Sequence, residues 1–431
     1  MPRMPAEIWE DLNNSINITS ELQEEMNEAI AEPPDPEPEP TPGPYQYGKL
    51  PTADQIIQCS EANQIRDALA AARPGTRIEV TSREYGGDFT LSTNGEPNKP
   101  IMIHAPQGAT FLGKFQIPGH WNGLSGITFK NNGRKIDISG RGGRVLRCTF
   151  PNIQYDGMIY LTGDSHPDAM LDFNLFQNIK GAAIRSEIKD STKHKNMRIA
   201  YNYVKTHTVL GDNESVMLIL TDAYDAADLV YECNRFEDCM INHESIGQKE
   251  LISGKTGGIK FISNTIVRCR GGFICLRETR GCLVDSNWLR DNSYVKVHGD
   301  NHEIRNNNGI GKTIELNAGN QTFDAPLPSQ CQNYSKAGRT PVIVKNGNCA
   351  TAHTATRNTE VHQTIGDIIV GQGYPDMSFK CKNINLHHNK TKAQVINNSC
   401  DGFTETNIGN CTNTAYEMTA AMVGPNAPAP T

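Results

Sequence analysis

The sequence predicts an all-β protein: a right-handed parallel β-helix that carries an N-terminal helical, proline-rich extension. Three observations support this prediction. Only 37% of the 431 residues are apolar and only 7% are aromatic, a composition that disfavours a helical bundle. Short stretches of alternating apolar and polar residues recur along the chain, as in strands. Beside them a short polar residue, usually Asn, returns at intervals of 19 to 32 residues, which is typical of a solenoid.

The recurring unit is clearest in DFNLFQNI, AYNYVKTH and DSNWLRDN. An Asn at an inward turn can bond to its counterparts in the coils above and below, so the repeat predicts a ladder of buried Asn side chains. A leucine-rich solenoid is excluded because no L-x-x-L-x-L pattern recurs. The anchor positions are Gly126, Cys148, Asn174, Asn202, Asn234, Asn264, Asn287 and Asn306.

Residues 1–44 form an acidic unit of their own. They hold one base and eleven acids, a charge of −10, which leaves +3 for the other 387 residues of a chain whose total is −7. Residues from Ile8 to Ala29 follow the spacing of a coiled-coil seam that includes the polar Ser15 and Thr19. The proline-rich residues 32–44 favour an extended spacer. A monomeric helix, an oligomerising helix and a solvated tail are alternatives. Attachment to other copies of the chain, or to a virion such as a phage tail, is among the expected roles.

The rest of the chain begins with a helix and ends in a segment whose repeat is blurred. Glu61–Ala72 predicts a short helix closed by Pro74 and Gly75, placed to cap one end of the β-structure. We expect residues 45–318 to form the β-helical domain. Residues 319–431 are expected to form either further coils or a C-terminal cap, with a disordered end.

The cysteines do not predict a metal site, since the sequence has no paired CxxC. We expect most of them to be buried thiols. The main exception is a disulfide among Cys331, Cys349, Cys381, Cys400 and Cys411. No apolar run is long enough to predict a membrane span. The N-terminus has acids where a secretory signal has bases, so we expect no classical signal peptide and an extracellular or virion-associated protein.

The charged residues between Gln248 and Trp288 indicate where chemistry takes place. Residues of successive coils lie above one another, so positions one coil apart can share a site. Lys255 follows the strand-like ELIS, and Arg277 and Arg280 come 22 and 25 residues later. A nearby cation lowers the pKa of a lysine and suits it to act as a general base. The alternative is an ordinary solvated surface.

The ordered motifs of this region resemble the core of the family 6 polysaccharide lyases, the family of chondroitinase B and many alginate lyases. They are GDNESVMLIL, NRFEDC and QKELISGKTGGIKFISNTIVRCRGGFICLRETRG. The resemblance implies β-elimination on an acidic, uronate-containing polysaccharide such as alginate or a glycosaminoglycan, and neither a nucleic acid nor a membrane as partner. In that reaction the carboxylate is neutralised, a base takes the C5 proton and the 4-linked oxygen leaves. Lys255 matches the family's base and Arg277 its acid.

The resemblance also implies a calcium ion beside the substrate carboxylate. Glu250 matches one of its ligands, Gln248 stands where the family has a second Glu, and Asn213 matches a third ligand after a local shift. Because Gln248 is neutral, calcium is expected only as an option. The candidate substrate-binding residues are Arg280, Arg270, His243 and Glu278.

Two other classes of protein remain as alternatives. A β-helical glycosidase needs a pair of carboxylates about 5 to 10 Å apart, for which Asp222, Asp225 and Asp228 are candidates. A non-catalytic glycan-binding spike needs no such pair. The products of the reaction separate the three: β-elimination leaves an unsaturated uronate that absorbs ultraviolet light, hydrolysis leaves none, and a spike cleaves nothing.

Overall fold

The computed structural model separates into two units, residues 1–43 and residues 44–431. It describes residues 45–430 apart from 131–132, 134, 155–156, 163–167, 188–195, 209–215, 221–227, 240–249, 270, 323–327, 332–341, 346, 352, 373–378 and 397–399. The helix and proline-rich spacer predicted for residues 1–44 lie outside the described residues.

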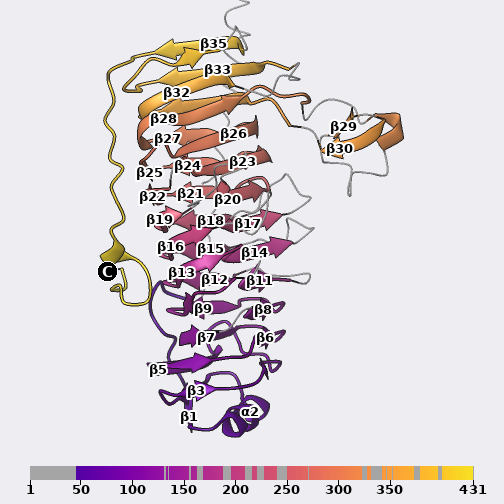
Figure 1. Ribbon diagram of the computed structural model, residues 1–431, viewed down its shortest axis with the longest axis vertical. Coiled ribbons are helices and arrows are strands. Elements are labelled where there is room, and N and C mark those ends of the chain that lie inside the picture. Colours follow the sequence, from indigo (N-terminus) through magenta and orange to yellow (C-terminus); the bar gives the residue numbers. More distant parts are fainter. Residues whose placement is uncertain are drawn as a thin grey trace, which may run out of the picture. The chain divides into compact units, whose positions relative to one another are not determined.

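The described residues of the second unit contain a 33-stranded sheet that winds into stacked coils (Figure 1). Each strand pairs in parallel with the strands one coil before and one coil after it, along three faces. This arrangement confirms the predicted parallel β-helix. Among the described residues, no helix has the length and apolar character needed to cross a membrane.

The first face carries the candidate site. Its strands are β4 (Phe89–Thr90), β6 (Phe115–Ile117), β8 (Ile136–Ile138), β11 (Ile159–Leu161), β14 (Ile184–Glu187), β17 (Met217–Leu220), β20 (Glu250–Lys255), β23 (Phe273–Arg280), β26 (Tyr294–Asp300), β28 (Asn308–Asn317), β32 (Ile365–Gln372) and β34 (Gln394–Val395).

The second face follows the first along each coil. Its strands are β1 (Gln55–Cys59), β2 (Thr76–Val80), β5 (Ile101–Phe111), β7 (Asn122–Phe129), β9 (Arg144–Leu146), β12 (Met170–Asp172), β15 (Met197–Ala200), β18 (Leu229–Glu232), β21 (Lys260–Ile262), β24 (Leu283–Asp285), β27 (Glu303–Arg305), β31 (Arg357–His362), β33 (Cys381–His387) and β35 (Cys400–Thr406).

The third face completes each coil, and the long strands β5, β7, β28 and β32 reach it from the other faces. Its own strands are β3 (Glu84–Tyr85), β10 (Thr149–Pro151), β13 (Leu175–Lys180), β16 (Tyr203–Thr208), β19 (Arg235–Cys239), β22 (Thr265–Val267) and β25 (Trp288–Leu289). The coils continue past residue 318 through β31 to β35, so the β-helix extends into the segment for which the sequence left coils and cap as alternatives.

The helix α2 (Ala62–Ala71) covers the first coil, next to β1 in Figure 1. Glu61 is its N-cap, and Gln64 completes a capping box. Ile65 and Leu69 are buried against the strands below. The predicted capping helix is therefore confirmed, and it shields the open edge of the first coil from pairing with another chain.

The interior is filled by apolar side chains that stack from coil to coil. Phe150 lies between Phe129 and Phe176, with ring centroids 5.1 and 4.8 Å apart and the rings nearly parallel. Such stacks follow from the parallel register, because equivalent residues of successive coils sit directly above one another. The regular interior fixes the coils on which the candidate site is built.

The predicted asparagine ladder runs along the turn between the second and third faces. Each Asn Oδ1 accepts the backbone N–H of the preceding rung, and from Asn202 onward also its Nδ2–H, at 2.9 to 3.1 Å. The rungs are Asn174, Asn202, Asn234, Asn264, Asn287 and Asn307, all buried.

The prediction of Asn306 as the last rung is wrong by one residue. Asn307 is the fully buried rung, whereas Asn306 precedes it with φ of 56° and donates to Ser286 Oγ. The residue before each rung has the same left-handed backbone, as at Phe173 and Tyr201 with φ of 59° and 55°. A non-glycine residue there costs about 1–2 kcal/mol. The hydrogen bonds of the ladder stabilise this turn. Asn306 and Asn307 differ only in their positions in the turn, which the sequence does not reveal.

Replacing the rung Asn234 with alanine is expected to lower the free energy of unfolding by about 1–3 kcal/mol, because buried backbone groups of the preceding coil lose their partner. Among them are the N–H of Asn202 and the carbonyl of Ile199. Denaturant unfolding measures the loss. Asn385→Ala, which removes an exposed amide from β33, is the matched control. An equal loss in both variants would contradict the ladder's role.

The cysteines follow the prediction. A disulfide joins Cys331 to Cys349, two of the five residues among which one was expected. It links the short helix η2 (Ser329–Cys331) to the antiparallel hairpin of β29 (Val342–Lys345) and β30 (Asn348–Thr351). The buried free thiols among the described residues are Cys59, Cys148, Cys233, Cys239, Cys269, Cys275, Cys282 and Cys381.

The prediction of a disordered C-terminal end is wrong. The last residues run back along the side of the β-helix, where Figure 1 shows them in yellow. Met418 and Val423, which flank η3 (Ala420–Met422), are buried with Cys233, and the N–H of Gly424 donates to the carbonyl of Tyr201 at 2.9 Å. These side chains pack against the left-handed turns at Tyr201 and Cys233. The segment has no apolar periodicity, so its docking could not be predicted from the sequence.

Candidate functional site

The strands β20 and β23 bring Lys255 and Arg277 to equivalent positions of adjacent coils. Ser253 pairs with Cys275 and Gly254 with Leu276, and the next residue on each strand is Lys255 or Arg277. Adjacent coils are about 4.8 Å apart. The structure thus brings together the two residues that the sequence analysis proposed as base and acid.

Both side chains point away from the core. Leu276 belongs to the hydrophobic core, and a Cβ on Gly254 would meet Ile259 and Phe261, so the preceding residue of each strand faces inward. Because side chains alternate along a strand, Lys255 and Arg277 face outward. The Arg277 side chain is 21% exposed, which leaves the guanidinium within reach of a ligand.

Glu250 lies beside Arg277 and holds its guanidinium. Arg277 Nη1 donates to Glu250 Oε1 at 3.2 Å, and the Glu250 side chain is only 8% exposed. A β-bulge between Glu250 and Ile252 shifts the register at the start of β20. A charge-assisted bond between partly buried partners restricts the arginine rotamer. Glu250 therefore positions Arg277, a role that the sequence analysis did not assign to it.

His298 adds a buried imidazole one coil beyond Arg277 that was not among the residues predicted from the sequence. It follows Val297, the partner of Leu276, and its Nδ1 lies 3.2 Å from the carbonyl oxygen of Thr354. Burial lowers the pKa of His298 well below its usual value, and the positive charges of Lys296 and Arg277 lower it further. The ring is therefore neutral at pH 7. The spacing of one coil length between Arg277 and His298 is the feature of the sequence that could have identified His298.

Further cations and aromatic rings lie on the first face, within two coils of Arg277. Lys296 pairs in register with Cys275 on β23, and its Nζ lies 5.7 Å from the ring centroid of Phe273. In the following coil Lys312 Nζ lies 3.4 Å from the ring centroid of Tyr294 and 2.7 Å from Glu315 Oε2. Positive charge next to aromatic rings suits a sugar that bears a carboxylate.

Only some of the other predicted site residues belong to the described part of the chain. Arg280 ends β23, where it pairs in register with Asp300 and so stands three residues along the strand from Arg277. Glu278 belongs to β23, but its side chain is outside the described part of the chain. The predicted residues that lie outside the described stretches altogether are Asn213, His243, Gln248 and Arg270.

The predicted calcium site lies only partly within the described residues. Calcium takes six to eight oxygen ligands, most of them carboxylates and carbonyls. Of the three predicted ligands only Glu250 is described, and its Oε1 accepts a bond from Arg277. Among the described residues there is no cluster of three or more His, Cys, Asp or Glu side chains that could hold a metal ion.

The fold is shared with solved polysaccharide lyases, although no protein-family model and no curated protein matches the chain. A mannuronic acid-specific family 6 lyase from the human gut microbiota is 14% identical, with a TM-score of 0.62, over 84% of this chain and 89% of that one. The family 6 lyase of Pseudopedobacter saltans is 16% identical, with a TM-score of 0.58, over 86% and 99%. The family 6 alginate lyase AlyGC is 18% identical, with a TM-score of 0.55, over 82% of this chain and only 53% of its own length. At these identities the likeness shows the shared β-helical fold.

Proposed function

We propose that the protein is a polysaccharide lyase that cleaves a uronate-containing polysaccharide by β-elimination. The observation that carries the proposal is the outward-facing pair of Lys255 and Arg277 at equivalent positions of adjacent coils, with Glu250 bonded to Arg277. The fold supports it, since the solved structures that share the fold include an alginate lyase and a lyase specific for mannuronic acid.

The residues of the site supply each part of the reaction. Arg277 and Lys296 provide positive charge that neutralises the uronate carboxylate and so acidifies the C5 proton. Lys255, as the base, takes that proton, the electron pair forms the C4–C5 double bond, and the bond from C4 to the glycosidic oxygen breaks. The Arg277 guanidinium gives a proton to the leaving oxygen and regains one from solvent, and Glu250 keeps the guanidinium oriented. No step requires a second carboxylate or a water nucleophile.

Incubation of the protein with alginate, dermatan and pectic substrates tests the proposal. Growth of the ultraviolet absorbance of an unsaturated uronate on one of these polymers is the expected result. New reducing ends without absorbance would show that the protein is a hydrolase and not a lyase. No cleavage of any polymer would favour a glycan-binding spike.

The structure offers the glycosidase alternative little support. Asp222 and Asp225 lie outside the described residues. Asp228 precedes β18 on the second face, and its Oδ1 lies 3.4 Å from Arg198 and 4.0 Å from Lys260. An aspartate between two cations has a structural role of its own, so no observation favours it as a catalytic acid.

We expect activity to persist in the presence of a calcium chelator. The reason is that Glu250, the described candidate ligand, already bonds to Arg277, and that Gln248 is neutral. The initial rate of absorbance growth before and after chelation, with magnesium-saturated chelator as the control, measures this. A loss of activity that added calcium restores would show that Gln248 and Asn213 complete a metal site.

The acidic N-terminal unit has a separate role in this proposal. Its charge of −10 repels a polyanionic substrate, so residues 1–44 are unsuited to bind the polysaccharide. We propose that they attach the protein to a virion or to further copies of the chain, outside the cell. The oligomeric state of the full chain in solution tests the second of these roles.

A further inference from the structure

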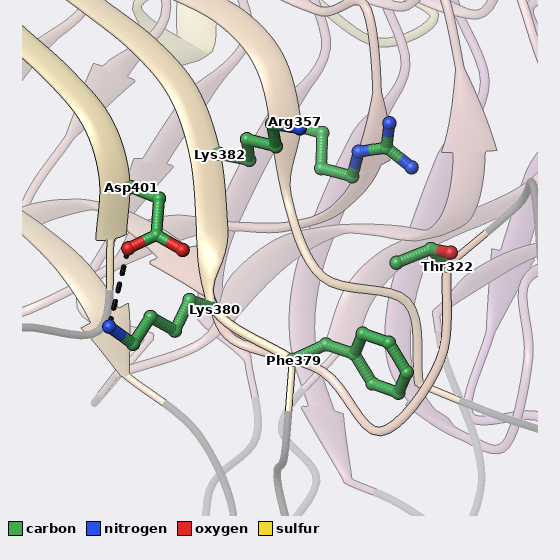
Figure 2. Close-up of a pocket in the computed structure, with 6 residues that line it drawn as sticks. All are labelled: Thr322, Arg357, Phe379, Lys380, Lys382 and Asp401. Atoms are coloured by element: carbon green, nitrogen blue, oxygen red, sulfur yellow. Dashed lines mark hydrogen bonds and ion pairs between the residues drawn. The ribbon is translucent and has the colours of Figure 1, made fainter.

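A second site with an excess of positive charge lies near the C-terminal end of the β-helix. It is a pocket of about 400 Å³ lined by Thr322, Arg357, Phe379, Lys380, Lys382 and Asp401. Figure 2 shows these side chains around one space, with Lys380 and Asp401 joined across one side at 3.2 Å. Three cations against one carboxylate leave the lining with a net positive charge. The pocket therefore favours an anionic ligand.

The strand register connects this pocket to the candidate site. Arg280 at the end of β23 pairs with Asp300, Asp300 pairs with Arg357, and Arg357 pairs with Lys382. These residues form one column along the corner where the first face passes into the second. The coil of Lys382 lies three coils beyond the coil of Arg277, which corresponds to a rise of roughly 14 Å along the β-helix. A polymer that lies along this corner from Arg277 reaches the pocket after a few sugar residues.

Phe379 gives the pocket an apolar surface as well as charge. Its side chain is 39% exposed, although it is one of the large apolar residues that a fold normally buries. Its backbone is fixed by two bonds to Gly319, of 2.9 and 2.8 Å. An exposed ring beside cations suits the apolar face of a pyranose whose carboxylate points to the lysines. A small inorganic anion would use the charge and leave the ring without a partner.

We propose that this pocket binds a uronate residue of the same polysaccharide chain that occupies Lys255 and Arg277. The inference rests on the proposed function, since it extends that site by about three coils. It predicts a preference for long substrates. An oligosaccharide that reaches both places gains the contacts of the pocket, and a shorter one does not.

Steady-state kinetics on uronate oligosaccharides of increasing length tests the inference, with wild type and the double variant Lys380→Met/Lys382→Met. The ion pairs that Lys380 and Lys382 would form with the uronate carboxylate together correspond to about a tenfold change in affinity. We expect KM for the long substrates to rise by about tenfold in the double variant, with kcat and the KM of the short substrates unchanged. Lys392→Met, which removes an exposed lysine outside the pocket, is the control. A double variant that keeps the length preference of the control would overturn the inference.

Direct binding separates this inference from the proposed reaction. Calorimetric titration of the same oligosaccharides into full-length Lys255→Ala, with and without the two lysine substitutions, measures the pocket without cleavage. If wild type cleaves no uronate polymer but binding still depends on Lys380 and Lys382, the binding role of the pocket is supported and the lyase proposal is contradicted. If wild type cleaves the polymer and the two lysine substitutions leave binding unchanged, the binding role of the pocket is contradicted and the lyase proposal is supported.

Discussion

Replacing Lys255 with alanine is expected to lower the rate of β-elimination by about 10²- to 10⁴-fold, the usual contribution of a positioned general base. The fall should appear in kcat, because the side chain acts on the C5 proton in the transition state and contributes little to ground-state binding. The ultraviolet absorbance of the unsaturated product, measured on the polymer that wild type cleaves, gives both constants.

Lys260→Ala is the matched control for Lys255→Ala. Lys260 lies in the same coil, on the second face, and is exposed beside Asp228. Its loss should leave kcat unchanged. If both lysine variants kept activity close to that of wild type, the base would have to be another residue, and the neutral imidazole of His298 would be the next candidate among the described side chains.

Replacing Asp172 with alanine is expected to lower the free energy of unfolding by about 3–5 kcal/mol, the cost of leaving one partner of a buried ion pair without the other. Asp172 accepts two bonds from Arg144, of 3.2 and 2.8 Å, and both side chains are fully buried. Asp172 also accepts the N–H of Gly48, and Arg144 donates to the carbonyls of Gln46 and Lys49. The pair thus anchors the segment through which residues 1–44 join the β-helix.

Denaturant unfolding of the full chain measures the effect of Asp172→Ala, and limited proteolysis near residues 45–50 reports release of the anchored segment. Asp54→Ala is the control, since Asp54 pairs with Lys99 at 2.8 Å while both side chains are more than half exposed. Its loss should cost less than about 1 kcal/mol. An Asp172→Ala protein as stable as this control would show that the buried pair does not hold the segment.

The fold was predictable because one residue type repeats for one physical reason. An Asn rung is the short side chain that satisfies both a backbone N–H and the next rung, so it recurs once per coil from Asn174 onward. The helix between β1 and β2 could also be predicted, from the pattern that ends at Pro74 and Gly75. The choice between Asn306 and Asn307 could not, because spacing does not separate neighbouring residues with the same side chain.

The candidate site was predictable in its placement and not in its contacts. Register alone puts Lys255 above Arg277, and the 22-residue spacing showed it. Arg277 bonds to Glu250 at a place where the strand register shifts, and such a shift leaves no periodic signal in the sequence. The pocket around Lys382 follows an insertion that includes the hairpin of β29 and β30, which breaks the repeat between Asn307 and the later coils.

The central claim is that Lys255 and Arg277 break the polymer by elimination, without water entering the product. Digestion in ¹⁸O-labelled water, followed by mass spectrometry of the oligosaccharides, tests it most directly. Elimination predicts products that carry an unsaturated uronate at the new non-reducing end and no label from the breakage, with none formed by Lys255→Ala. Saturated products that have gained labelled oxygen at the new reducing end would show hydrolysis and would contradict the account.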